Sequence, residues 1–177
     1  MKTIGTCLVL FCVTWWAAER WPRPDLAEQA HRAAVAGDAA ELSWLLSRGL
    51  DVNAEVNGVT PLELAAGAGR AEAVRVLLDG GARVDRKNAS GVTPLIWAVH
   101  GGNVEAVRLL VRAGADVNAA EYNGITPLIM AASRDPAIVR TLLDAGADKD
   151  ARSSAGTTAY DAAAAAENEE NMVLLAP

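Results

Sequence analysis

A repeat of about 33 residues constrains the fold of this chain more than any other feature of its sequence. Three copies of Gly-Val/Ile-Thr-Pro-Leu begin at equal spacing, at Gly58, Gly91 and Gly124, and a degenerate copy follows at nearly the same spacing, at Gly156. A Leu-Leu or Leu-Val pair before a glycine turn recurs in step with them, the glycines being Gly49, Gly81, Gly114 and Gly146. A fixed period of this length predicts a stack of similar supersecondary units, none of which buries its apolar face alone.

The best-preserved copy, residues 91–116, predicts two short helices. Thr93 is expected to cap the first helix, and Pro94 suits its first turn because proline has no amide hydrogen to leave unpaired. Gly101 and the glycine after it are expected to end that helix after about two turns. Asn103 then occupies the N-cap position of the second helix.

Each of these helices carries an apolar stripe at helical spacing. The stripe residues are Leu95, Ala98 and Val99 in the first helix and Val104, Val107, Leu110 and Val111 in the second. Glu105 and Arg108 are expected to pair on the exposed side of the second helix. Gly114 is expected to end it in the left-handed conformation.

The resulting unit of helix, tight turn, helix and hairpin-like loop, with Thr-Pro-Leu at its start and Leu-Leu-x-x-Gly-Ala-Asp-Val-Asn near its end, resembles the ankyrin repeat. The resemblance covers roughly residues 25–175, with three full copies and two atypical ends. It implies an all-α solenoid of helix-turn-helix units joined by β-hairpin-like loops. The family's usual histidine after Thr-Pro-Leu is replaced by Glu63, Ile96 and Ile129, and only His31, in the first unit, occupies that place.

Two units depart from the repeat pattern, but their residues still predict the same helices. In the fourth unit Asp135 and Pro136 replace the glycine turn and supply a new N-cap and first-turn proline. In the last unit the alanine run 162–166 predicts a helix. We expect about five units over residues 25–177, the first and last acting as caps with polar outer faces, as solubility requires at the ends of a stack.

Residues 1–18 differ from everything that follows. Lys2 precedes an uncharged apolar run, residues 4–18, which is typical of a secretory signal peptide and short for a spanning helix of about 20 residues. Trp16 is unfavourable three places before a cleavage after Ala18, so an uncleaved signal anchor is an alternative, and a buried N-terminal segment is a third. Residues 19–24 are expected to form a short linker.

We therefore expect an exported protein of bacterial type, periplasmic or extracellular, or else anchored in the membrane by residues 4–18. Both cysteines lie in the leader, so the repeat domain would tolerate an oxidising compartment without mispaired disulfides. The net charge of −6 argues against a nucleic-acid partner, which would favour clustered basic residues.

The sequence offers no group of residues suited to catalysis. The repeat domain holds two histidines, His31 and His100, and no cysteine, so we predict no enzyme activity, no metal and no cofactor. One aspartate recurs at each repeat start and is interpreted as a turn or cap residue, at Asp51, Asp85, Asp116 and Asp148.

The family resemblance implies a concave groove lined by the loop tips and the exposed sides of the first helices. Carried over by position, the partner-binding candidates are Val56, Asn57, Val59, Lys87, Ala89, Ser90, Val92, His100, Tyr122, Asn123, Ile125, Ser133 and Arg152. Tyr122 is the best single anchor, since tyrosine supplies contact area at little entropy cost. The apolar row Val59, Val92, Ile125 either contacts a partner or only stabilises the extended loops. Trp44 and Trp97 are assigned to the core.

The function predicted from the sequence is therefore binding of another protein, of unknown identity, by a monomeric exported ankyrin-repeat protein. Membrane contact is expected only through the leader, if it stays uncleaved. The alternative is an inhibitor or immunity protein that blocks an exported enzyme or toxin with the same groove.

Overall fold

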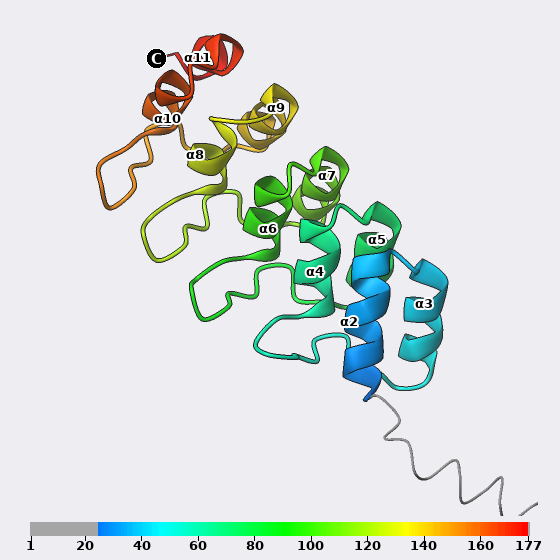
Figure 1. Cartoon of the computed structure of the whole chain (residues 1–177). Helices are drawn as coiled ribbons and strands as arrows, with labels where there is room; N and C mark the ends of the chain where they lie inside the picture. The colour runs from blue at the N-terminus through cyan, green and yellow to red at the C-terminus, as the bar shows by residue number, and fades with distance from the viewer. Residues whose placement is uncertain (1–24, 177) are drawn as a thin grey trace, which may run out of the picture.

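The computed structural model describes residues 25–176, which form five helix pairs stacked side by side (Figure 1). The pairs are α2 (Leu26–Ala36) with α3 (Ala39–Ser47), α4 (Pro61–Gly67) with α5 (Ala71–Asp79), α6 (Pro94–His100) with α7 (Val104–Arg112), α8 (Pro127–Ala131) with α9 (Pro136–Asp144), and α10 (Ala159–Ala165) with α11 (Glu169–Leu175). The predicted all-α solenoid is confirmed. The predicted leader and linker lie outside the described residues.

Long loops, here called fingers, connect each pair to the next and project to one side of the stack, the lower left in Figure 1. They are residues 48–60, 80–93, 113–126 and 145–158. Within residues 25–176 they contain no strand, and the first finger holds an isolated antiparallel bridge between Val56 and Val59. The fingers are thus hairpin-like without forming a continuous sheet.

Threonine caps start the first helices of the last four pairs, as the sequence predicts. The side-chain oxygen of each accepts a hydrogen bond from the backbone amide three residues later, at Thr60, Thr93, Thr126 and Thr158. Asp135 likewise accepts from the amide of Ala137 at 2.8 Å and starts α9, which confirms the substitute cap of the fourth unit. These caps satisfy amides that would otherwise lack partners at a helix start.

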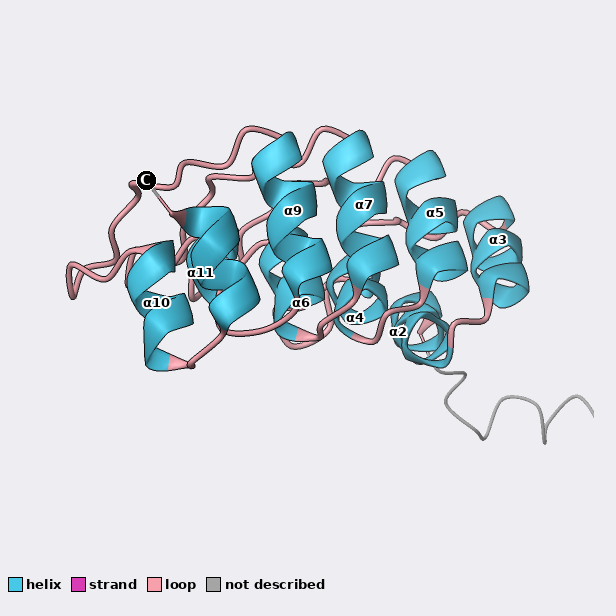
Figure 2. Ribbon diagram, turned by 90° about the horizontal axis from the view of Figure 1, so that it is seen from above, coloured by secondary structure: helices cyan, strands magenta, loops and turns pink. Residues whose placement is uncertain are grey.

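First helices pack on first helices and second helices on second helices along the stack, so that two rows share one apolar core (Figure 2). Leu95, Ala98 and Val99 are fully buried from the first row, as are Val107 and Leu110 from the second. Gly114 has φ of 88° after α7, so its predicted left-handed conformation is confirmed. No unit could bury its stripe alone, because each core residue lies between neighbouring pairs.

Two expectations for α7 are wrong, while its stripe residues Val104 and Val111 are half-buried and pack against the core. Among the described residues, Glu105 and Arg108 form no ion pair. Asn103 stands at the N-cap position of α7 without making a side-chain cap. Its amide nitrogen instead donates to the carbonyl oxygens of Ala66 and Gly67, at 3.0 and 2.9 Å, in the preceding unit.

The assignment of tryptophans to the core is wrong for Trp44 and only partly right for Trp97. Trp44 is 50% exposed, because it lies two residues after Leu42, about 200° around the helix and hence on the side of α3 away from the core. The Arg48 guanidinium lies 5.5 Å from the centre of its ring. Trp97 is half-buried and packs at the edge of the core.

Side-chain oxygens link each finger to the next at equivalent positions, and we call these bonds the finger ladder. The amides of Arg83, Asp116 and Asp148 donate to Asn53, Asp85 and Asn118, at 2.8, 2.9 and 2.9 Å. Asp51, Asp116 and Asp148 each accept from the amide two residues later. The interpretation of the recurring aspartates as turn residues is confirmed for these three, whereas Asp85 joins two units.

The two ends of the stack differ. At the first pair, a shallow depression is lined by Gln29, Arg32, Ala33, Ala36, Asp38 and Glu41, which fits the expected polar cap. At the last pair, Glu169 and Glu170 are exposed, but Val173 is 77% and Tyr160 38% exposed. The expectation of a polar outer face is therefore wrong for the last unit.

Candidate functional site

The fingers and the first helices form one surface, and the structure distributes the predicted binding residues over it. The exposed ones are Asn57, Lys87, Ala89, Ser90, His100, Tyr122, Asn123, Ser133 and Arg152. The half-buried ones are Val56, Val59, Val92 and Ile125. Polar and small side chains are thus presented outward, while the β-branched residues sit at the bases of the fingers.

The β-branched row helps to hold the fingers closed. The carbonyl oxygens of Val59, Val92 and Ile125 accept from the amides of Val56, Asn88 and Glu121, at 3.1, 3.0 and 3.2 Å. Their side chains are half-buried, as expected for residues that stabilise an extended loop. This geometry supports the loop-stabilising interpretation for all three, and Val92 in addition lines a hollow.

That hollow, here called the α6–α8 hollow, has a volume of about 210 Å³ and is lined by Val92, Ile96, Trp97, His100 and Met130. Its lining is almost wholly apolar, and it lies between the first helices of the third and fourth units. The sequence predicted Val92 and His100 as site residues and missed Ile96, Trp97 and Met130. Trp97 lies three residues before His100, so helical spacing could have placed it beside that groove residue, although the sequence analysis assigned it to the core. The contribution of Met130 depends on how α8 packs beside α6.

The position of Trp97 depends on Gly67 in the preceding unit. A Cβ atom at Gly67 would lie 2.9 Å from Cε3 of the indole, closer than real contacts allow. The absence of a side chain at Gly67 therefore lets the indole pack against α4. The indole Nε1 is buried and has no hydrogen-bond acceptor among the described residues. An unpaired buried donor is costly, which is why few native structures retain one.

Tyr122 lies farther out, across two fingers. Its side chain is 76% exposed, its amide donates to the carbonyl oxygen of Ser90 at 3.2 Å, and a Cβ at Gly91 would lie 2.9 Å from its Cδ1. The ring thus rests over the backbone of the preceding finger. This leaves a large aromatic surface exposed in a fixed place, which suits an anchor.

The histidine position of the family is used differently in each unit. His31 places its ring nitrogens 2.6 Å from the Ala27 carbonyl oxygen and 2.7 Å from that of Val59, joining the first helix to the following finger. Ile96 and Ile129 are buried apolar residues. Glu63 is fully buried and binds both its own cap and Arg86 of the following finger. In the second unit, an ion pair between Glu63 and Arg86 therefore replaces the link that histidine makes between the first helix and the following finger.

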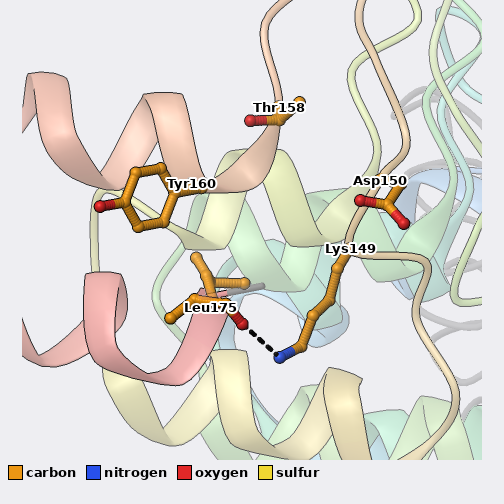
Figure 3. Close-up of a pocket in the computed structure, with 6 residues that line it drawn as sticks. Lys149, Asp150, Thr158, Tyr160 and Leu175 are labelled. Atoms are coloured by element: carbon orange, nitrogen blue, oxygen red, sulfur yellow. Dashed lines mark hydrogen bonds between the residues drawn. The ribbon is translucent and has the colours of Figure 1, made fainter.

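A larger depression of about 590 Å³ lies at the far end of the stack (Figure 3), lined by Lys149, Asp150, Thr158, Tyr160, Leu175 and Ala176. The Lys149 ammonium donates to the carbonyl oxygens of Leu174 and Ala176 at 3.0 and 3.3 Å. This lysine thereby caps the end of α11, which is a structural task. None of its lining residues is among the predicted partner-binding residues.

Residues 25–176 hold no group of three or more histidine, cysteine, aspartate or glutamate side chains placed to bind a metal ion. Nor does any helix in this range combine the length and apolar character that crossing a membrane requires.

Stacked helix pairs with projecting fingers define the class of helical-repeat solenoid proteins. A family model for ankyrin repeats in three copies matches residues 30–121 and 80–153, well over half of the chain, so the protein belongs to the ankyrin-repeat family. Ankyrin repeats are in general protein–protein interaction modules, and the family is typically non-enzymatic. A comparison with curated proteins gave no match.

Proposed function

We propose that this chain binds another protein through the surface formed by its fingers and first helices, with the α6–α8 hollow at the centre of the contact. The single observation that carries the proposal is the hollow itself. Its lining is nearly all apolar, and it lies on the side of the stack where the predicted binding residues gather. Apolar hollows at a surface rimmed by polar residues often mark protein–protein interaction sites.

The surroundings of the hollow have the composition of an interface. Its volume of about 210 Å³ is several times the ~30 Å³ share of one water molecule, which leaves room for one bulky apolar side chain. Tyr122 adds exposed aromatic area on a neighbouring finger, and polar residues such as Lys87 and Asn123 surround it. Interfaces combine an apolar, aromatic centre with a polar rim in this way.

The test is recovery of the partner with the purified chain, followed by calorimetry with a variant of the hollow. Met130→Glu places a charge in the hollow and should weaken binding by more than about tenfold, since an unpaired charge is costly to bury at an interface. Arg75→Ala and Arg108→Ala, on the exposed side of the second helices, should leave the affinity within about twofold. An affinity unchanged by Met130→Glu, in a chain whose circular dichroism is unaltered, would exclude the hollow as the site.

We also propose that the protein acts outside the cytoplasm. The basis is Lys2 followed by the uncharged run 4–18, together with a repeat domain that contains no cysteine. Cell fractionation and the intact mass of the mature protein test this directly. A soluble, full-length chain in the cytosol would contradict it.

A further inference from the structure

The surface of α10 and α11 that faces away from the stack is the most exposed apolar area of the last unit. Tyr160, Glu169, Met172, Val173 and Ala176 line a depression of about 410 Å³ there. Tyr160 and Ala176 also line the depression of Figure 3, so the two depressions are continuous. We call this combined surface the end face.

The end face is equivalent to a contact surface used inside the stack. Within the described residues, α10 packs on α8 and α11 packs on α9, so the last pair has a neighbour on one side only. In the inner pairs the residues equivalent to Tyr160 and Met172 are buried, at Leu62, Leu95 and Leu128 and at Val74, Val107 and Val139, whereas those equivalent to Val173 are the exposed Arg75, Arg108 and Arg140. The part of the end face around Tyr160 and Met172 therefore matches a surface that accepts a helix, and Val173, 77% exposed where the inner units carry arginine, adds apolar area at its edge. The depression at the opposite end is lined by mostly polar residues.

Acidic side chains outnumber basic ones in the last helix pair and the finger before it, and two of them, Asp150 and Glu169, line the end face itself. Residues 148–176 hold six acidic side chains and two basic ones: Asp148, Asp150, Asp161, Glu167, Glu169 and Glu170 against Lys149 and Arg152. Lys149 is engaged with the carbonyl oxygens of Leu174 and Ala176, and Arg152 with that of Gly156. Glu170 is paired with Arg140, while Glu167 and Glu169 are exposed and form no ion pair within the described residues.

We propose that the end face docks a basic amphipathic helix of a partner protein, whose apolar side covers Tyr160, Met172 and Val173. Lysine or arginine residues flanking that apolar side would meet the acidic residues around the end face, and complementary charge favours both the encounter and the correct partner. A second copy of this chain is disfavoured as the occupant, because two end faces meeting each other would bring the same excess of carboxylates together.

The probe is a synthetic helical peptide of about 18 residues, five turns, with leucines along one side and lysines along the other. A matched peptide carries glutamates in place of the lysines. Binding of each to the full-length chain is measured by fluorescence anisotropy in about 0.15 M salt, and again in about 0.5 M salt, where exposed charges are screened more strongly. We expect the lysine peptide to bind, the glutamate peptide not to bind, and the affinity to fall with salt.

Two pairs of variants locate the binding. Val173→Ser should weaken binding of the lysine peptide at least about fivefold, since it removes apolar contact area, while Val35→Ser at the opposite end should change it less than about twofold. Glu169→Gln should weaken it about threefold at the lower salt concentration, and the matched first-turn variant Glu28→Gln should not. Sedimentation of the chain alone measures self-association.

Three results would overturn the proposal. The first is failure of the lysine peptide to bind. The second is equal effects of Val35→Ser and Val173→Ser, which would mean that the peptide binds elsewhere. The third is a dimer that Val173→Ser dissociates, which would identify a second copy as the occupant.

Discussion

The guanidinium of Arg86 lies 3.0 Å from the carboxylate of Glu63, a side chain with no exposed surface, although 23 positions separate the two residues in the sequence. The same carboxylate accepts from the amide and hydroxyl of Thr60 at 2.6 and 2.9 Å. Burial by itself lowers the pKa of Arg86, but its hydrogen bond to Glu55 and the charges of Glu63 and Glu55 outweigh that effect, so the pKa is raised above its usual value. The pair fastens the second helix pair to the following finger.

Removing the arginine should therefore be strongly destabilising. Arg86→Met keeps the apolar stem but leaves the buried Glu63 carboxylate without its counter-charge, and we expect a loss of about 3 kcal/mol in the free energy of unfolding. Urea melts measure it. Arg83→Ala is the control, since Arg83 joins the finger ladder through its backbone amide, and it should cost less than about 0.5 kcal/mol.

The neighbouring units suggest a second substitution that should restore the stability lost in Arg86→Met. Ile96 and Ile129 occupy the position of Glu63 in the third and fourth units and are buried without any ion pair. The double variant Glu63→Ile, Arg86→Met should regain most of the stability that Arg86→Met loses, because well-packed apolar residues commonly replace a buried ion pair at no net cost. A double variant as unstable as the single one would show that the carboxylate does more than satisfy Arg86.

Variants of Asn103 test whether its side chain stabilises the protein by capping α7 or by joining two units. Because its amide donates to Ala66 and Gly67 of the preceding unit, Asn103→Ala should cost about 1 to 2 kcal/mol. Asn103→Ser supplies a good N-cap but cannot reach those carbonyl groups, so it should be no more stable than the alanine variant within about 0.5 kcal/mol. Full recovery by serine in thermal or urea melts would restore the capping interpretation.

The lowered pKa of Asp161 predicts that the free energy of unfolding depends on pH in the acid range. Hydrogen bonds from the amide and the hydroxyl of Thr158 lower the pKa of this carboxyl below its ordinary value, and burial opposes them only weakly. Because the folded pKa is the lower one, the stabilisation is complete above the unfolded pKa of 3.8 and is lost as the pH falls from there through the folded value.

Asp161→Asn should accordingly be less stable than the unaltered chain at pH 7, with the difference shrinking below about pH 4. Urea melts at several pH values follow it, and Asp144→Asn, at the exposed end of α9, is the control. A difference independent of pH down to about 2 would contradict the assigned hydrogen bonds.

Replacing Tyr122 should weaken partner binding while leaving the stability of the fold nearly unchanged. Since its ring is 76% exposed, Tyr122→Ala should change the free energy of unfolding by less than about 0.5 kcal/mol. Binding to the recovered partner should weaken by more than about 1 kcal/mol, as measured by calorimetry. Equal losses for Tyr122→Ala and Arg108→Ala would move the site away from the fingers.

Local signals made the helices predictable. The Thr-Pro starts and the glycine after α7 act within a few residues of themselves, and the structure reproduces them. Asp135 replaced a missing glycine turn by an equally local device. The stripe residues Leu95 and Leu110 followed from helical spacing alone.

Contacts between residues far apart in the sequence could not be predicted from such local signals. Asn103 carries the residue type of a cap, and only the proximity of Ala66 and Gly67 assigns its amide to another task. Arg86 gives no sign in the sequence that its partner lies in the preceding helix pair. Trp44 was assigned to the buried stripe of its helix, whereas its angular position on α3, between the buried Leu42 and Leu45, places it outside.

The finger ladder also contributes to how the stack resists bending, beside the contacts between its two rows of helices. Each of its bonds joins one finger only to the next, at Arg83, Asp116 and Asp148, so the ladder transmits tension between the two ends one step at a time. The fingers then behave as elastic elements in series, whose small openings add up to a change in the curvature of the whole surface. A partner that spans several fingers would stiffen the stack, while one that contacts a single finger would leave its bending modes nearly unchanged.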